Sequence, residues 1–382
     1  MKLLYCIPAL NNAGGMERVL TEKVNYLINR PDYAITIVTT EQKNRDIRFA
    51  LDKRIRVVNL DLNFNDHFEN TLFKKYVLHK TKLKSYKQKL TELITELNID
   101  ICISLCGKEI EFLSDLNVSC KKVAEIHFSM NNRMQFIMSR HNGFIWKSLG
   151  KIRTYQLKKS VSKIDKLIVL TQKDKTQWER THNNIICIPN PNPLSNQTVA
   201  NLDRHRVITV GKLDAQKGYD ILINVWALVH QKFPFWKLDI FGVGEWNEML
   251  YNRICELDLS DSVKLCGLTN NVTEEYLKSS IYVMSSRYEG LPMVLIEAMS
   301  CGLPLVSFDC EYGPSEIITD AVDGFLVEEN NLEKFAAKIC LLIENDELRK
   351  DMGNMASINV QRYSKDKIMN QWIGLFESLV TN

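Results

Sequence analysis

The sequence predicts an α/β protein that is built from two Rossmann-like domains, each organised around a parallel β-sheet. At 382 residues the chain is longer than one ordinary hydrophobic core accommodates, so two domains are expected. Short apolar or β-branched segments alternate with longer amphipathic segments, which is the pattern of successive βα units. A segment with three prolines, residues 188–198, interrupts this alternation and predicts a linker.

The first alternation predicts an N-terminal domain over residues 1–190. Its first strand is expected in KLLYCIP and its first helix in MERVLTEKVNYLINR, and helical segments separate most of the later strands. This order of strands and helices is typical of a parallel sheet. The expected strands lie at 2–8, 33–40, 99–105, 121–127, 165–171 and 185–189.

The second alternation predicts a C-terminal domain over residues 195–365. The last helical segment, at about 366–382, could pack on either domain, including back on the N-terminal one. Open parallel sheets bind ligands beyond the carboxyl ends of their strands, so two such domains predict a ligand-binding cleft. Helices are expected to begin near Gly218, Glu245, Thr273, Pro292 and Ser315. The expected strands lie at 205–211, 236–242, 262–267, 281–286 and 303–308.

Composition and charge predict a globular protein without a membrane span. Apolar residues make up 45% of the chain and charged residues 25%, and the net charge of +3 is small, so any functional charge has to be local. No apolar run approaches the roughly 20 residues that cross a bilayer. The ten cysteines form no C-x-x-C pair, which predicts buried free thiols in a reducing compartment. We therefore expect a cytoplasmic protein, or one that lies against the membrane from that side.

Two glutamates, Glu289 and Glu297, lie eight positions apart in a segment that is otherwise almost uncharged. The strand at 281–286 ends just before them, and a helix is expected to have Pro292 at its first position and to end at Gly302. Both carboxylates can then project toward the carboxyl end of the strand, where free helix N–H groups prefer an anion. A ligand with phosphates and hydroxyls would satisfy both features. The alternative is that Glu289 is a favourable first-turn charge and Glu297 a solvated helix residue.

Two lysines lie in the loop between the strand at 205–211 and the next helix. Lys217 directly precedes Gly218, near which the helix begins, and a cation at a helix N-terminus opposes the helix dipole. An anion bound between Lys212 and Lys217 would remove that conflict. Two solvated loop lysines are the alternative.

Two further features lie in the N-terminal domain. Gly14 and Gly15 join the first strand to the first helix, where a glycine loop allows the backbone to approach an anion closely. Two glycines in such a turn are just as often purely structural. His127 follows a strand, and taken alone it would be a structural histidine at a strand end.

Four segments together resemble the retaining glycosyltransferases of family 4, the group 1 glycosyl transferases, which have the GT-B fold. EGLPMVLIE, residues 289–297, resembles their signature of two glutamates separated by seven residues. GKLDAQKG at 211–218 resembles their diphosphate-binding loop, and AGGMERV at 13–19 resembles their N-terminal glycine loop. GPSEIITDAVDGFLV at 313–327 resembles the segment that usually follows. The resemblance implies two Rossmann-like domains that face each other across a cleft.

The resemblance also implies roles for the matching residues. Glu289 would contact hydroxyls of the donor sugar, and Glu297 would hold the ribose of the nucleotide. Lys217 and Lys212 would bind the diphosphate, although the family commonly has arginine where Lys212 stands, and lysine lacks bidentate geometry. His127 would be the active-site histidine, so Glu289, His127 and Lys217 are the expected catalytic residues. The remaining expected donor-binding residues are Gly15, Gly290, Leu291, Pro292, Met293 and Val294.

The implied reaction is hexosyl transfer with retention from a nucleotide-sugar, for which UDP is the expected nucleotide and GDP the alternative. Cleavage of the sugar–phosphate bond loads negative charge onto the leaving diphosphate, so positive charge is needed there. The sequence contains no D-x-D motif to hold a metal. Two lysines and helix N-termini would take its place, so we expect neither a metal nor another cofactor.

Two basic stretches bear on the acceptor. Residues 74–89 hold seven lysines and no acid, and residues 126–164 hold eight Lys or Arg residues and no acid, with Trp146 and other apolar residues among them. Such stretches are typical of a surface for anionic lipid or for a lipid-diphosphate acceptor, and a solvated basic face is the alternative. The similarity to bacterial enzymes of lipid-linked oligosaccharide, lipopolysaccharide and surface polysaccharide synthesis implies a glycan or lipid-linked glycan acceptor.

Two other classes of protein fit the sequence less well. An NAD-dependent oxidoreductase or epimerase would need a glycine fingerprint after the first strand and an acid about 20 residues further on, and PALNNAGGM lacks that spacing. A non-catalytic binder of anions or nucleic acid would use the basic stretches, but these belong to no recognised nucleic-acid-binding motif. We therefore expect no nucleic-acid partner.

Overall fold

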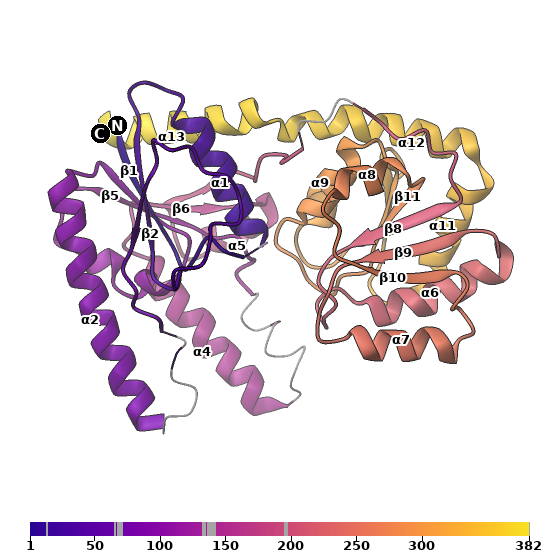
Figure 1. Ribbon diagram of the computed structural model, residues 1–382, viewed down its shortest axis with the longest axis horizontal. Coiled ribbons are helices and arrows are strands. Elements are labelled where there is room, and N and C mark those ends of the chain that lie inside the picture. The colour runs from indigo at the N-terminus through magenta and orange to yellow at the C-terminus, as the bar shows by residue number, and fades with distance from the viewer. Residues whose placement is uncertain are drawn as a thin grey trace. The chain divides into compact units, whose positions relative to one another are not determined.

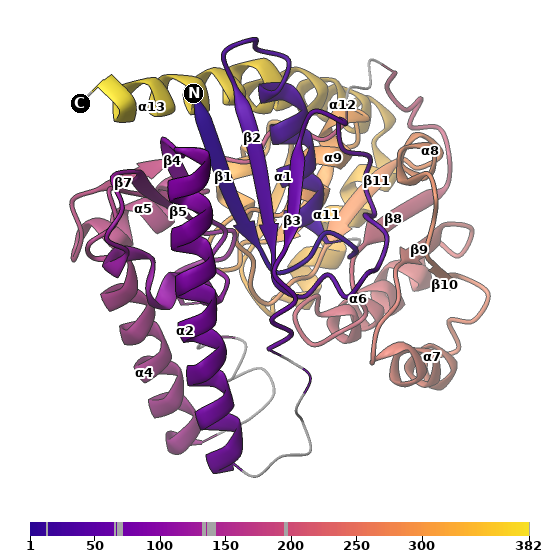
Figure 2. The same cartoon turned by 60° about the vertical axis from the view of Figure 1, so that its left-hand side comes forward.

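Figures 1 and 2 show the computed structural model of the chain, which divides into two compact units. The N-terminal unit comprises Met1–Met130, Lys151–Pro191 and Asp366–Asn382, and the C-terminal unit comprises Asn131–Gly150 and Asn192–Lys365. The residues that the structure describes are 1–12, 14–64, 66, 72–131, 135, 143–194 and 198–381.

In the described part of the N-terminal unit, seven strands form a parallel sheet in the order β3-β2-β1-β4-β5-β6-β7. The central strand β1 pairs on both sides, with Tyr5 opposite Ile37 of β2 and opposite Ile103 of β4. The strand order therefore reverses between β1 and β4. The strands are β1 (Lys2–Ile7), β2 (Ala34–Thr39), β3 (Arg56–Asn59), β4 (Ile101–Ser104), β5 (Lys121–Glu125), β6 (Lys166–Val169) and β7 (Ile185–Cys187).

Helices cover both faces of this sheet. On one face, the apolar side of α1 and the C-terminal helix α13 bury Val24 and Trp372 against Tyr5. On the other face, α2, α4 and α5 contribute Tyr86, Leu157 and Trp178 to a second core. The helices are α1 (Gly15–Leu27), α2 (Leu72–Leu97), α4 (Phe144–Val161), α5 (Gln172–Glu179) and α13 (Lys365–Thr381), with the short 3-10 helices η1 (Lys108–Glu111) and η2 (Leu113–Asp115).

The C-terminal unit contains a second parallel sheet, and its six strands within the described residues have the order β10-β9-β8-β11-β12-β13. Trp226, Phe308 and Phe335 lie in its core. The strands are β8 (Arg206–Val210), β9 (Lys237–Phe241), β10 (Val263–Gly267), β11 (Ile281–Met284), β12 (Leu305–Phe308) and β13 (Gly324–Val327). The helices are α6 (Tyr219–Lys232), α7 (Asn247–Glu256), α8 (Val272–Leu277), α9 (Met293–Ser300), α10 (Pro314–Ile317), α11 (Leu332–Glu344) and α12 (Asp346–Asn359), followed by the 3-10 helix η3 (Val360–Tyr363).

The predicted α/β class with two parallel sheets is confirmed. The sequence did not predict β3 and β13 as strands. β3 is a four-residue edge strand with partly exposed side chains, so it lacks the apolar run that marks a central strand. Pro292 was expected at the first helical position, but it is the N-cap of α9 with ψ 96°, so the helix begins one residue later. No helix in the described ranges combines the length and apolar composition that a membrane span requires.

Candidate active site

The C-terminal sheet reverses its strand order between β8 and β11. β8 is the first strand of this unit, and β9 and β10 lie on one side of it while β11, β12 and β13 lie on the other. Loops that follow the strands at such a reversal diverge and leave a crevice, where doubly wound sheets bind their ligands. The two loops here are residues 211–218 and residues 285–292. Both contain residues that the sequence predicts for the donor site.

Lys217 and Glu289 meet at this reversal as a largely buried ion pair. Nζ of Lys217 lies 2.6 Å from Oε1 of Glu289, and the two side chains are 18% and 7% exposed. Burial by itself lowers the pKa of Lys217, but the adjacent Glu289 carboxylate outweighs burial, so this pKa lies above its usual value. Lys217 is therefore a cation at neutral pH, held at the carboxyl end of the sheet.

Gly218 allows the two loops to approach each other. It is the N-cap of α6 and has φ +65°, a left-handed conformation that favours glycine. A Cβ at this position would lie 2.2 Å from the carbonyl oxygen of Ser285. The Ser285 hydroxyl in turn donates to the carbonyl oxygen of Lys217 at 2.9 Å. The backbone at Lys217 is therefore fixed against the loop that carries Glu289.

Arg287, which the sequence analysis did not identify, also joins the two loops. Its guanidinium donates to both carboxylate oxygens of Asp220, at 2.9 and 2.6 Å, and to the carbonyl oxygen of Ala215 at 2.9 Å. Its backbone N–H donates to the carbonyl oxygen of Gln216 at 2.8 Å. The Gln216 amide returns a hydrogen bond to the carbonyl oxygen of Tyr288 at 3.0 Å. The fork of donors on arginine suits such a junction.

Glu297 is buried inside the C-terminal unit rather than solvated on the surface of its helix. It lies on α9, and its Oε2 accepts a hydrogen bond from the hydroxyl of Tyr276 at 3.2 Å. Burial and the Glu297 carboxylate raise the pKa of Tyr276 well above its usual value, so its hydroxyl remains a donor. A ligand that reaches Glu297 would therefore meet a carboxylate whose orientation Tyr276 helps to fix.

Lys212 differs from Lys217 although both belong to the same loop. The Lys212 side chain is 63% exposed, and its Nζ lies 3.5 Å from Oδ2 of Asp214. An exposed contact of this kind contributes little to stability and leaves the side chain free to change partners. The structure thus brings Lys217 and Glu289 together and leaves Lys212 at the surface.

The N-terminus of α9 adds backbone donors at the same end of the sheet. Its N-cap, Pro292, provides no side-chain acceptor for the first turn. The N–H groups of Met293 and Val294 belong to that turn, where helix geometry offers no partner within the helix. Gly290 and Leu291 connect this turn to Glu289. The predicted donor-binding residues 289–294 therefore form one continuous segment at the strand-order reversal.

Gly14 and Gly15, the two glycines of the predicted loop, differ in what an added side chain would meet. A Cβ at Gly14 would lie 2.3 Å from Oε2 of Glu17, so the Glu17 side chain would have to move to admit one. A Cβ at Gly15 would meet nothing within 4 Å. Gly15 is the first residue of α1, which begins after the carboxyl end of β1. No contact among the described residues requires glycine at position 15.

His127 lies two residues beyond β5, at the carboxyl edge of the N-terminal sheet. Its Nε2 lies 3.1 Å from Oε1 of Glu125, the last residue of β5. Lys23 of α1 forms an ion pair with the same oxygen. His127 and Gly15 are thus the two predicted site residues of this unit, and each follows the carboxyl end of a strand.

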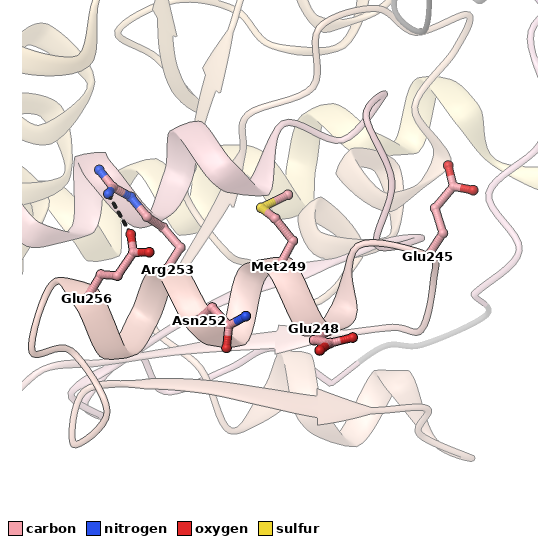
Figure 3. A pocket seen from close by; sticks show the side chains of 6 residues that line it. All are labelled: Glu245, Glu248, Met249, Asn252, Arg253 and Glu256. Atoms are coloured by element: carbon pink, nitrogen blue, oxygen red, sulfur yellow. Dashed lines mark hydrogen bonds and ion pairs between the residues drawn. The ribbon is translucent and has the colours of Figure 1, made fainter.

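A surface depression of about 460 Å³ lies along α7 (Figure 3). It contains none of the predicted site residues, and within it Arg253 forms an ion pair with Glu256 at 3.0 Å. Its lining residues are Glu245, Glu248, Met249, Asn252, Arg253 and Glu256. Within the described residues, no cluster of three or more His, Cys, Asp or Glu side chains is arranged to hold a metal ion.

Comparison with known proteins supports one family. The family described as Glycosyl transferases group 1 matches residues 192–358. An uncharacterized glycosyltransferase of Haemophilus influenzae is 34% identical over 379 residues, which are 98% of this chain and 99% of that protein. A poly(ribitol-phosphate) alpha-N-acetylglucosaminyltransferase of Staphylococcus aureus is 32% identical over 222 residues, which are 57% of this chain and 45% of that protein.

Among solved structures, a mutant of S. aureus TarM in complex with Fondaparinux, alpha-GlcNAc-glycerol and UDP has a TM-score of 0.77 to this chain. The likeness covers 98% of this chain and 99% of that one at 20% identity, so it shows the shared fold. It confirms the GT-B fold that the resemblance implied. The Haemophilus influenzae glycosyltransferase, which matches this chain over nearly its whole length, establishes the family. The chain belongs to the group 1 glycosyl transferases and is a glycosyltransferase.

Proposed function

We propose that the chain transfers a hexosyl group, with retention, from a UDP-sugar to a glycan or lipid-linked glycan acceptor in the synthesis of a bacterial surface polysaccharide. The buried Lys217–Glu289 pair at the strand-order reversal carries this proposal. A charged pair removed from water is costly unless other groups compensate it, and it is often no more stabilising than an apolar pair. A function that needs both charges at this place accounts for its presence.

In this proposal the donor's diphosphate becomes the anionic partner of Lys217, which pairs with Glu289 in the free protein. Lys217 pairs with Glu289, which lies four residues before α9, so a diphosphate bound here would be offered a cation by Lys217 and backbone N–H groups by the first turn of α9. As the sugar leaves, negative charge grows on that phosphate, and the fixed cation stabilises it. This arrangement needs no metal in the site, so turnover is expected to persist in excess EDTA.

The two glutamates then bind different parts of the donor. When the diphosphate engages Lys217, the Glu289 carboxylate becomes available to the hydroxyls of the sugar. Glu297 lies about one helical turn into α9 and would accept hydrogen bonds from the ribose hydroxyls. Retention means that an α-linked donor gives an α-linked product, which the anomeric coupling constant of the product reports.

The nucleotide is the part of the proposal with an independent precedent. TarM, which shares the fold, has been crystallised with UDP. A thermal-shift panel of UDP, GDP, UDP-sugars and GDP-sugars tests this directly, because a ligand at one hundred times its Kd stabilises the folded state by about 2.7 kcal/mol. UDP compounds should raise Tm and GDP compounds should not. A Tm increase with GDP compounds alone would make GDP the nucleotide of the donor. No Tm change with either nucleotide would contradict the proposed donor site.

The acceptor side is proposed to involve an anionic membrane surface on the cytoplasmic side. Exposed apolar side chains lie among the cations of α4, where Ile152 is 54% and Tyr155 67% exposed. Lys151 and Arg153 flank them and are exposed as well. Apolar groups can enter the lipid interface while neighbouring cations meet anionic headgroups or a lipid-linked diphosphate. Arg133, Phe136, Ile137 and Arg140, which belong to the same basic stretch, lie outside the described residues.

A further inference from the structure

Two buried ionisable side chains, Lys23 and Glu125, lie behind His127 and form a continuous chain of contacts with it. Lys23 of α1 and Glu125 of β5 are each 1% exposed and form an ion pair. Oε1 of Glu125 also lies 3.1 Å from Nε2 of His127, whose side chain is 10% exposed. The chain of contacts thus begins in the interior of the N-terminal unit and ends at a residue near its surface, at the carboxyl edge of the sheet.

The C-terminal helix α13 contacts Lys23, the innermost residue of this chain of contacts. Nζ of Lys23 lies 3.6 Å from the ring centroid of Trp372 on α13, a distance at which an ammonium group and an indole face attract each other. Trp372 is buried in the same core as Val24 and Tyr5. The ammonium group of Lys23 therefore has an aromatic ring and a carboxylate as neighbours, and it is screened from water.

The opposite charges of Lys23 and Glu125 each favour the ionised form of the other residue. Burial alone raises the pKa of Glu125, but the Lys23 ammonium and then His127 outweigh it, so the pKa lies at about 2. Burial lowers the pKa of Lys23, and the Glu125 carboxylate opposes that effect. At neutral pH the residue behind His127 is therefore a carboxylate rather than a carboxylic acid.

Fold stability alone does not explain this arrangement. Well-packed apolar side chains in the place of a buried ion pair are often at least as stabilising. Moreover, Oε2 of Glu125 and Nε2 of His127 are buried without an aligned hydrogen bond within the described structure, as is the hydroxyl of Tyr5. Unpaired buried polar atoms are a cost that native proteins usually avoid. In catalytic sites, such contacts commonly align only when the substrate is bound.

We infer that Glu125 and Lys23 are positioning residues for His127. When substrate aligns the contact, Glu125 accepts the Nε2–H of the imidazole and thereby selects the tautomer whose Nδ1 is an acceptor for a substrate hydroxyl. Lys23, held by Trp372, keeps the carboxylate ionised and in place. The inference rests on the proposed role of His127 in the active site and extends it to the residues that orient the ring.

Glu125→Gln tests the inference, since the amide keeps the size of the side chain but loses the charge. We expect kcat to fall about 10- to 100-fold, the range typical of residues that orient a functional histidine, with the KM for the UDP-sugar nearly unchanged. In the His127→Ala background the same substitution should have no further effect, because the two residues act as one unit. The ¹⁵N NMR signals of His127 should show loss of the Nε2–H tautomer.

The matched control is Glu109→Gln, which alters another buried carboxylate of the same unit. Glu109 lies on η1 and accepts from Ser104 at 2.6 Å and Tyr86 at 3.2 Å, so its hydrogen bonds involve other partners. It should change stability without changing kcat or the His127 tautomer. If Glu125→Gln does not fold, the double variant Lys23→Met/Glu125→Gln removes both charges and leaves neither one unpaired.

The outcomes separate this inference from the proposed function. If His127→Ala retains wild-type kcat, the proposed role of His127 fails and the inference fails with it. If His127→Ala is impaired while Glu125→Gln retains wild-type kcat and tautomer, the inference alone is overturned. Effects of the two substitutions that add in the double variant would likewise make Glu125 independent of His127. UDP binding, measured on each variant, should be unchanged throughout.

Discussion

The two buried lysine–glutamate pairs of this protein have the same chemistry and different surroundings. Lys23 and Glu125 are packed between a helix and a strand and are each 1% exposed, whereas Lys217 and Glu289 come from two loops and are 18% and 7% exposed. The first pair is enclosed by the core, with Trp372 over the ammonium group. The second lies where ligands bind in sheets of this kind. Enclosure therefore suits a pair that orients a neighbour, and access suits a pair that exchanges partners with a substrate.

Unfolding should show the largest difference between the two pairs. Lys23→Ala leaves the Glu125 carboxylate buried without its main partner, which costs about 3–5 kcal/mol for a fully buried pair. Lys217→Ala should cost clearly less, because its pair is closer to solvent and the loops are also joined through Arg287. Denaturant titrations of both variants against the wild type measure this. Equal losses would show that enclosure does not distinguish the pairs.

Acid unfolding should separate Glu125 from Glu109. Because the folded pKa of Glu125, about 2, lies below its usual value, its stabilisation is present above pH 4.5 and is lost as pH falls toward 2. The shift corresponds to about 3 kcal/mol. Glu109 has the opposite sign, since burial raises its pKa, and its carboxylate form becomes a cost as pH rises. Glu125→Gln should flatten the acid limb of the stability curve and Glu109→Gln should not. Identical curves would contradict the charge state assigned to Glu125.

Substitutions of the two glutamates at the donor site should have different effects, one mainly on UDP binding and the other mainly on sugar transfer. Glu297→Ala removes the proposed ribose contact and should weaken UDP about tenfold, as the loss of a charged hydrogen-bond acceptor does. Glu289→Ala should leave UDP affinity within about threefold but lower kcat, because its partner is the sugar. Calorimetric titration with UDP and steady-state turnover measure the two effects. The same changes in UDP affinity and kcat in both variants would contradict the separate roles that we assign to Glu289 and Glu297.

The smallest effects are expected on the surface of α4. Single replacement of Lys147, Lys151 or Arg153 by alanine should weaken binding to anionic vesicles by about 1 kcal/mol, or about fivefold, and more salt should weaken it further. UDP affinity should not change, since none of these three residues is among the expected donor-binding residues. Vesicle co-sedimentation at two ionic strengths, with neutral vesicles as the control, measures this. Equal binding to both kinds of vesicle, or none to either, would leave α4 as a solvated basic face.

Local patterns in the sequence were sufficient for the architecture. Apolar runs such as residues 281–286 predicted central strands, because burial on both faces leaves little room for polar residues. The end of α9 was predicted from Gly302 and the proline beyond it, and the helix ends at Ser300, two residues before Gly302, which has φ +71°. The edge strand β3 was missed, since an edge strand needs no apolar run. Pro292 was placed one residue too far into its helix, which is within the usual uncertainty of a helix boundary.

Contacts between residues far apart in sequence could not be predicted in this way. Arg287 and Asp220 are 67 positions apart, and no periodic pattern links them. Lys23 lies in a segment that was predicted to be helical, and no local pattern shows that it is buried against Glu125, 102 positions away. The similarity to a family supplied the expected roles of Lys217 and Glu289. Their pairing at 2.6 Å became visible only in the folded structure.

Turnover of a UDP-sugar by Lys217→Ala, compared with Lys212→Ala, tests the central claim most directly. If the buried cation stabilises the departing diphosphate, Lys217→Ala should lose about two orders of magnitude in kcat while remaining folded. Lys212→Ala should lose about tenfold or less, because its side chain is 63% exposed and contacts Asp214. Wild-type kcat in a folded Lys217→Ala variant would contradict the account and leave the Lys217–Glu289 pair as a structural link between two loops.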